Sequence, residues 1–183
     1  MKTDNQKDSQ AELPAVWVGD LGDYNAGILT GEWIVIEKGT TLEGLQDRIN
    51  AILKRGVTED SPHEEWFVAD YNYLPLSAQY PDLSAVIVVA QLVIEQGYRV
   101  TKAFIDHFGE QNTDEFYERF CGVYDSVQDY VHELINDCYN LEAVMGELSS
   151  YFDYEKYAND LEYGGDITSS YIGSGQVAIF HNY

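Results

Sequence analysis

The sequence predicts a protein of the α/β class, in its α+β form, with short antiparallel sheets and acidic helices. Short segments rich in β-branched and aromatic residues, such as TGEWIVI at 30–36, lie beside glycine-rich turns and indicate strands. Longer stretches, such as 42–55 and 125–139, repeat apolar residues every three or four positions, which is typical of amphipathic helices. Hydrophobic residues make up 45% of the chain, enough to bury a core beneath both kinds of element.

The N-terminal part has the pattern of a small β-β-α unit. Two short strands are expected at 15–18 and 30–36, and the glycine-rich segment GDLGDYNAG between them predicts a loop. Thr41 is a suitable N-cap for a helix over 42–55, and Gly56 follows as a stop signal.

The middle of the chain is predicted to be mostly helical. A short strand is expected at 66–69, followed by a turn in the segment DYNYLP at 70–75. Periodicity alone leaves 83–96 open between a buried strand and a buried helix, but its length and the glycine that follows favour a helix. A further helix is expected at 100–108, again ending at a glycine.

The C-terminal part combines helices with a hairpin. Helices are expected at 113–120, 125–139 and 151–163. Alternating segments at 166–171 and 176–180 flank the turn sequence GSG and predict a β-hairpin. The apolar face of the middle helix is expected to comprise Val127, Tyr130, Val131, Leu134, Ile135 and Cys138.

The charge balance narrows the class of partner. The chain has 32 Asp and Glu against 10 Lys and Arg, a formal net charge of -22. Such a protein is repelled by nucleic acid and by anionic membrane surfaces, so we expect no direct nucleic-acid or membrane binding. Aromatic residues make up 14% of the chain, which indicates a folded body rather than a disordered acidic segment. Its partners should therefore be cationic.

The first residues and the cysteines indicate a reducing compartment. Residues 1–12 are polar and without an apolar run, which predicts a disordered tail rather than a signal peptide and a cytoplasmic location. The longest apolar segment, within 83–94, is too short to span a bilayer. Cys121 and Cys138 form no CxxC or Cys/His cluster, so we expect small and mostly buried thiols.

No motif for catalysis or cofactor binding is found in the sequence. The four histidines are scattered and no HExxH, GxGxxG, P-loop or GxSxG segment occurs. The calcium-loop pattern is also missing. We therefore expect a protein that is not an enzyme and has no catalytic residues, no metal and no cofactor.

One helix carries a regular row of acids. Asp125, Asp129, Glu133 and Asp137 recur every four residues, and we refer to them as the acidic stripe. Like charges at this spacing each cost a helix about 0.2 to 0.5 kcal/mol, so the stripe offers no local stability. It is either an ordinary solvated face or a surface displayed to a partner. Only Arg119 and Lys156 oppose the acidic residues between 104 and 166.

Four segments carry a resemblance to a known family. They are AVWVGDLGDYNAGILTGEWI from Ala15, DYNYLP from Asp70, FYERFCGVYDS from Phe116, and LSSYFDYEKYANDL from Leu148, which is followed by EYGGD. Together they resemble ArdA-type antirestriction proteins, and the fourth segment looks like the antirestriction motif of that family.

The resemblance implies an elongated, curved protein of three small domains. We place them at 13–61 (β-β-α), 62–108 (mostly helical) and 109–183 (α+β, with acidic helices, the motif and the hairpin). It also implies a homodimer formed through the C-terminal part, which imitates bent B-form DNA. The implied partner is the DNA-binding core of Type I restriction-modification enzymes, formed by their specificity and modification subunits. Proteins of this kind are typically carried by mobile genetic elements.

Two groups of residues are candidates for these contacts. The motif residues are expected to pack within the domain or at the dimer seam: Tyr151, Tyr154, Tyr157 and Leu161. Acids of the C-terminal part are expected to form a partner-binding surface, which we call the acidic surface: Asp114, Glu115, Glu118, Asp125, Asp129, Glu133, Asp137, Glu142, Glu147, Asp153, Glu155, Asp160, Glu162 and Asp166.

Two other functions are compatible with the same composition. An acidic adaptor would shield another basic DNA-binding protein and would discriminate little among cationic partners. A hydrolase with paired carboxylates would need a clustered pocket. The four matching segments favour the antirestriction protein.

Overall fold

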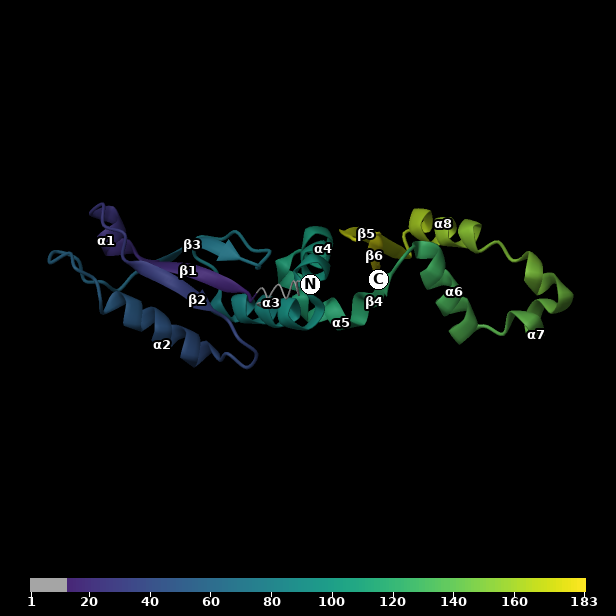
Figure 1. The fold of residues 1–183 in the computed structure, drawn as a ribbon, viewed down its shortest axis with the longest axis horizontal. Helices are drawn as coiled ribbons and strands as arrows, with labels where there is room; N and C mark the ends of the chain where they lie inside the picture. The colour runs from purple at the N-terminus through teal and green to yellow at the C-terminus, as the bar shows by residue number, and fades with distance from the viewer. Residues whose placement is uncertain (1–12) are drawn as a thin grey trace, which may run out of the picture. The chain divides into compact units, whose positions relative to one another are not determined.

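The computed structural model describes residues 13–183 and confirms the α+β class (Figure 1). The chain divides into two compact units, the first ending at Lys102 and the second comprising Ala103–Tyr183. Each unit has its own three-stranded antiparallel sheet. The tail expected at 1–12 lies outside the described residues.

The sheet of unit 1 has the strand order β2-β1-β3. β1 (Ala15–Asp20) and β2 (Gly31–Val35) confirm the two predicted N-terminal strands. β3 (Trp66–Asn72) is longer than predicted: Asp70 to Asn72 continue the strand rather than forming a turn, because they pair with β1 as far as Ala15. The turn prediction at 70–75 was wrong for these residues, since pairing with a neighbouring strand outweighed local turn preference.

The helices of unit 1 follow the periodicity of the sequence. α2 (Leu42–Leu53) begins after Thr41, whose hydroxyl accepts the backbone N–H of Gly44 at 3.1 Å. α3 (Leu83–Gln96) and α4 (Tyr98–Phe108) confirm the other two predictions, and α4 crosses into unit 2. The segment expected as a loop between β1 and β2 contains a short helix, α1 (Leu21–Asn25).

The core of unit 1 lies between the sheet and α2, which runs along it in Figure 1. Val16, Val18 and Ile34 are buried on the sheet, and α2 contributes a buried apolar face. The buried residues of that face are Leu45, Ile49, Ile52 and Leu53.

The domain boundary expected at 61 falls before the third strand of this sheet. β3, which follows the boundary, hydrogen-bonds to β1, which precedes it. Independent folding of the stretches 13–61, 62–108 and 109–183 stays a prediction.

The start of unit 2 differs from the predicted helix at 113–120. A 3₁₀ helix, η1 (Glu110–Glu115), is followed by one turn of α-helix, α5 (Phe116–Arg119), and then by β4 (Phe120–Tyr124). Phe116 is fully buried against Phe104, Phe120 and Phe180, with ring centroids 5.0 to 6.3 Å away, and Phe108 joins the cluster through Phe104 and Phe180. This aromatic cluster and the pairing of β4 with β6 end the helix early.

The sheet of unit 2 has the order β4-β6-β5. β5 (Ile167–Gly173) and β6 (Gln176–His181) form the predicted hairpin. Ser174 and Gly175 adopt φ angles of 57° and 80° at its tip, the left-handed pair that a tight hairpin turn requires.

The remaining helices of unit 2 pack on this sheet or extend from it. α6 (Val127–Cys138) is capped by Ser126, so Asp125 precedes the helix that it was expected to open. α8 (Tyr154–Gly164) is capped by Asp153, which shortens the helix expected at 151–163. Between them lie two elements that were not predicted, α7 (Leu141–Met145) and the 3₁₀ helix η2 (Gly146–Tyr151).

The two cysteines differ in their exposure to solvent. Cys121 is half-buried but Cys138 is exposed, so the prediction of a mostly buried thiol was wrong for Cys138, which lies in the last turn of α6. Within residues 13–183, no helix combines the length and apolar character needed to cross a bilayer.

Candidate functional site: an acidic protein-docking surface

The acidic surface lies almost wholly on the exterior of unit 2. Twelve of its fourteen residues are exposed, and only Glu115 and Glu162 are half-buried. Three of the four acids of the stripe are on α6, with Asp125 just before it. Their role in partner binding stays a prediction, but their side chains are accessible.

Several of these acids also have structural partners. Glu115 pairs with Arg119, with Oε2 lying 2.7 Å from Nε and 2.6 Å from Nη2. Glu162 accepts the hydroxyl of Ser169, and Asp129 accepts that of Ser126. Glu133 accepts the hydroxyl of Tyr124 at 3.1 Å, and burial together with this carboxylate raises the pKa of Tyr124 to about 12.

Basic residues do little to neutralise the surface. Arg119 forms an ion pair with Glu115, and its guanidinium also stacks 4.8 Å above the ring of Phe108. Lys156, the other basic residue between 104 and 166, is exposed on α8. The exterior of unit 2 therefore presents a predominantly negative field, which attracts a cationic protein surface.

The motif residues divide between the core and the surface. Tyr154, Tyr157 and Leu161 are half-buried and pack against the core cluster of unit 2. Tyr154 also stacks on His132, with ring centroids 3.7 Å apart and an interplanar angle of 17°. Tyr151 lies on η2 before the helix and is 82% exposed, so its ring is free to meet a partner.

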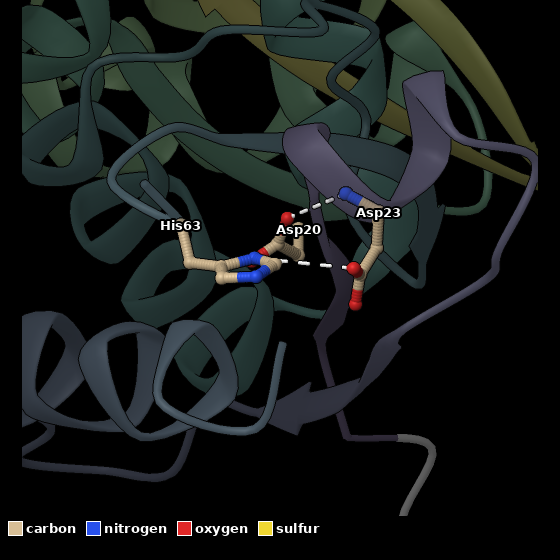
Figure 2. A group of neighbouring side chains, drawn as sticks. All are labelled: Asp20, Asp23 and His63. Atoms are coloured by element: carbon tan, nitrogen blue, oxygen red, sulfur yellow. Dashed lines mark hydrogen bonds and ion pairs between the residues drawn. The ribbon is translucent and has the colours of Figure 1, made fainter. Parts of the chain in front are cut away.

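A second cluster was not found by sequence reasoning, because its members are far apart in the chain. Figure 2 shows the imidazole of His63 pointing toward the carboxylates of Asp20 and Asp23, both fully buried. Asp20 ends β1 and caps α1: its Oδ1 accepts the backbone N–H of Asp23 at 2.8 Å. Asp23 accepts the N–H groups of Val57 and Thr58 and the hydroxyl of Thr58.

The geometry indicates that His63 is positively charged. Its Nδ1 lies 2.8 Å from Oδ2 of Asp20, and its Nε2 lies 2.9 Å from the carbonyl oxygen of Thr58. Both neighbours are acceptors, so both ring nitrogens must carry a proton. The hydrogen bond to Asp20 raises the pKa of His63. Desolvation by burial lowers this pKa, but the hydrogen bond to the backbone of Thr58 and the negative charges of Asp20 and Asp23 raise it further, so the net shift is upward.

The pKa of Asp23 is shifted in the opposite direction, downward. Burial pushes its pKa upward, but hydrogen bonds from Thr30, Thr58 and the backbone of Val57 outweigh burial and hold the pKa well below its usual range. Two carboxylates and one imidazolium thus form a buried ionic triad that joins the loop after α2 to the end of β1.

The same three side chains could in principle offer ligand atoms to a metal ion, since these atoms lie within 4.8 Å of one another. However, Nδ1 of His63 carries a proton in this arrangement and so has no lone pair to offer a metal ion. Both carboxylates already accept hydrogen bonds. No buried side-chain nitrogen or oxygen among the described residues lacks a partner. The triad therefore acts as a structural clamp.

A family model described as antirestriction protein (ArdA) matches residues 16–174, which include the sheet of unit 1 from Val16 onward and the whole acidic surface but not β6. The chain belongs to the ArdA antirestriction protein family. No curated protein matches the chain. Membership of ArdA, a family of non-catalytic proteins, implies an antirestriction function and an interaction with restriction-modification enzymes.

In this ArdA chain the triad predicts a loss of stability at alkaline pH. Because the pKa of His63 is raised in the folded state, its contribution is complete below the ordinary value of 6.5 and is lost as pH rises through the folded-state pKa. We expect the urea midpoint, followed by tryptophan fluorescence, to fall as the pH is raised above the ordinary value of 6.5. The variant His63→Gln should show a smaller fall, and equal falls in the two proteins would contradict the charged clamp.

Proposed function

We propose that this chain inhibits Type I restriction-modification enzymes by occupying their DNA-binding groove as a mimic of B-form DNA. The observation that carries the proposal is the acidic surface of unit 2, whose carboxylates are almost all exposed and meet few basic side chains. A groove built to hold phosphates with Lys and Arg should accept carboxylates at similar positions and release counterions as it does with DNA.

The charge spacing indicates that several elements must act together. Successive acids on α6 are about 6 Å apart along the helix axis, at 1.5 Å rise per residue. Duplex DNA presents about one charge per 1.7 Å of its axis. One helix is therefore too sparse, and the acids around η1, α6, α7, η2 and α8 are all needed to approach the density of DNA.

Local capping supports the mimic by holding these elements in place. Ser126, Asn140 and Asp153 each accept a backbone N–H in the first turn of their helix, at 3.1, 3.0 and 2.9 Å. A preorganised acidic surface loses less conformational entropy on docking than a flexible acidic tail would. No chemical step is required of the protein.

The proposal includes a homodimer in the cytoplasm. Apolar side chains around α7 and η2 are unusually exposed: Val144 at 75%, Leu148 at 62% and Tyr151 at 82%. Burying such residues against a second copy would remove apolar area from water. Sedimentation equilibrium of the purified chain measures the mass of this assembly directly.

The test is competition with DNA. The chain is added to a Type I methyltransferase core bound to labelled duplex DNA, at several salt concentrations. We expect displacement that weakens as salt rises, because the contacts are ionic. No displacement at any salt would refute the mimic. Displacement of DNA from unrelated basic proteins with equal potency would favour the acidic adaptor.

A further inference from the structure

The sheet of unit 1 has one face that α2 does not cover. Residues paired across an antiparallel sheet lie on the same face. Val16, Val18 and Ile34 are buried toward α2. Trp17, between Val16 and Val18 in the strand, therefore points to the opposite face.

A row of three side chains crosses this opposite face. Trp17 on β1 is paired in the strand register with Trp33 on β2 and with Asp70 on β3, next to a register shift between Trp17 and Val18, so the three residues occupy neighbouring positions across the sheet. The indole of Trp17 lies over two glycines: a Cβ on Gly31 would be 2.3 Å from its Cη2, and one on Gly19 would be 2.6 Å from its Cζ3. The two glycines thus allow the ring to rest against the backbone.

Two further aromatic rings follow on from Trp17: Phe67, which is buried, and then Tyr24, which is exposed. Phe67 lies 6.3 Å from Trp17 and 4.9 Å from Tyr24, measured between ring centroids. Tyr24 is 52% exposed and Trp33 is 43% exposed. A hollow of about 530 Å³ lies beside this region; it is lined by Tyr24, Phe67 and Asp70 among others, but not by Trp17 or Trp33. We call Trp17, Trp33, Phe67, Tyr24 and Asp70 the aromatic face.

The chemistry of the aromatic face favours a planar cation. Tryptophan provides the strongest cation–π surface of the side chains, and guanidinium groups stack on such rings while pairing with carboxylates. Asp70 is exposed and its Oδ1 accepts the backbone N–H of Tyr71 at 2.8 Å, but no ion pair to it occurs within 13–183. A net charge of -22 also selects cationic partners over neutral ones.

We propose that the aromatic face binds an arginine side chain presented by a basic protein partner. The guanidinium stacks on the indoles of Trp17 and Trp33 and pairs with the carboxylate of Asp70. This site differs from the acidic surface, which attracts charge without distinguishing arginine from lysine. The binding of an arginine side chain does not depend on the proposed function. If the basic partner is a restriction-modification enzyme, that identity rests on the proposed function.

The test is a titration of the full chain with N-acetyl-arginine amide, followed by the indole N–H signals in ¹H–¹⁵N NMR spectra. We expect saturable shifts for Trp17 and Trp33 and weaker ones with N-acetyl-lysine amide. Trp66 is an internal control, because it precedes Phe67 in β3 and so points to the other face. Shifts of equal size at Trp66, or with N-acetyl-leucine amide, would overturn the proposal.

Variants make the test specific. Asp70→Asn and Trp33→Ala should each weaken binding of the arginine amide by roughly two- to five-fold. Asp47→Asn, which removes the same charge from the exposed face of α2, should leave it unchanged. An unchanged affinity of Asp70→Asn for the arginine amide would overturn the site. Shifts of the Trp33 indole N–H signal with protein concentration alone, without the amide, would overturn it in favour of contact with a second copy of the chain.

The two proposals fail separately. Binding of the arginine amide is measured without any restriction enzyme, so a negative competition assay leaves it intact. Conversely, the variants Asp70→Asn and Trp33→Ala could compete with DNA as well as the original chain does. If the arginine amide also fails to bind, the aromatic face is refuted and the acidic surface is supported.

Discussion

Reversal of four acids on unit 2 is expected to weaken inhibition strongly while leaving the fold intact. In the variant Asp125→Lys, Asp137→Lys, Glu147→Lys and Asp160→Lys, all four positions are exposed and none makes a side-chain hydrogen bond or ion pair within residues 13–183. The net charge changes from -22 to -14, since each reversal adds two units. The concentration for half-maximal inhibition should rise on the order of 100-fold.

The measurement is DNA displacement from a Type I methyltransferase core, with circular dichroism to verify the fold. A matched control carries Glu43→Lys, Asp47→Lys, Glu59→Lys and Asp60→Lys, four exposed acids of unit 1 with the same change in charge. An equal loss of inhibition in the control would show that total charge decides binding and that the acidic surface of unit 2 has no special role.

Removal of the carboxylate of Asp23 is expected to destabilise unit 1 strongly. The variant Asp23→Ala leaves the backbone N–H groups of Val57 and Thr58 and the Thr58 hydroxyl without their acceptor, and it removes one negative charge beside His63. Unpaired buried donors cost more than the hydrogen bonds themselves contribute. The urea midpoint should fall by roughly 1 M.

Tryptophan fluorescence reports this change well, because Trp17, Trp33 and Trp66 all belong to unit 1. Asp47→Ala on the exposed face of α2 serves as the control and should leave the midpoint unchanged. Asp23→Asn retains one acceptor oxygen, so its urea midpoint should lie between those of Asp23→Ala and Asp47→Ala. A midpoint for Asp23→Ala equal to that of the control would mean that the triad does not clamp the loop.

Local sequence patterns were sufficient for the elements whose preferences agree with their surroundings. Residues 83–96 form the predicted helix because the segment is long, apolar and ended by Gly97. The hairpin at the C-terminus follows from alternating strands around GSG, whose tip needs positive φ angles. Thr41 caps α2 as its hydroxyl and position predict.

Patterns failed where a distant partner decided the outcome. Phe120 was predicted to end a helix and 121–124 to lie between two helices, but Phe120–Tyr124 form a strand because β6 provides a pairing edge and Phe180 a packing surface. Asp70 extends a strand against turn preference because Trp17 lies opposite it. Helical spacing also assigned Asp125 to α6, whereas Ser126 caps the helix one residue later.

Composition and motifs by themselves determined that this is an acidic, folded member of the ArdA family, because net charge and short motifs are properties of the chain alone. Only the tertiary structure brought His63 to Asp20 and Asp23, and Trp17 to Trp33 and Asp70. Such contacts join residues far apart in sequence, and their pairing depends on strand register and loop closure, which no local pattern encodes.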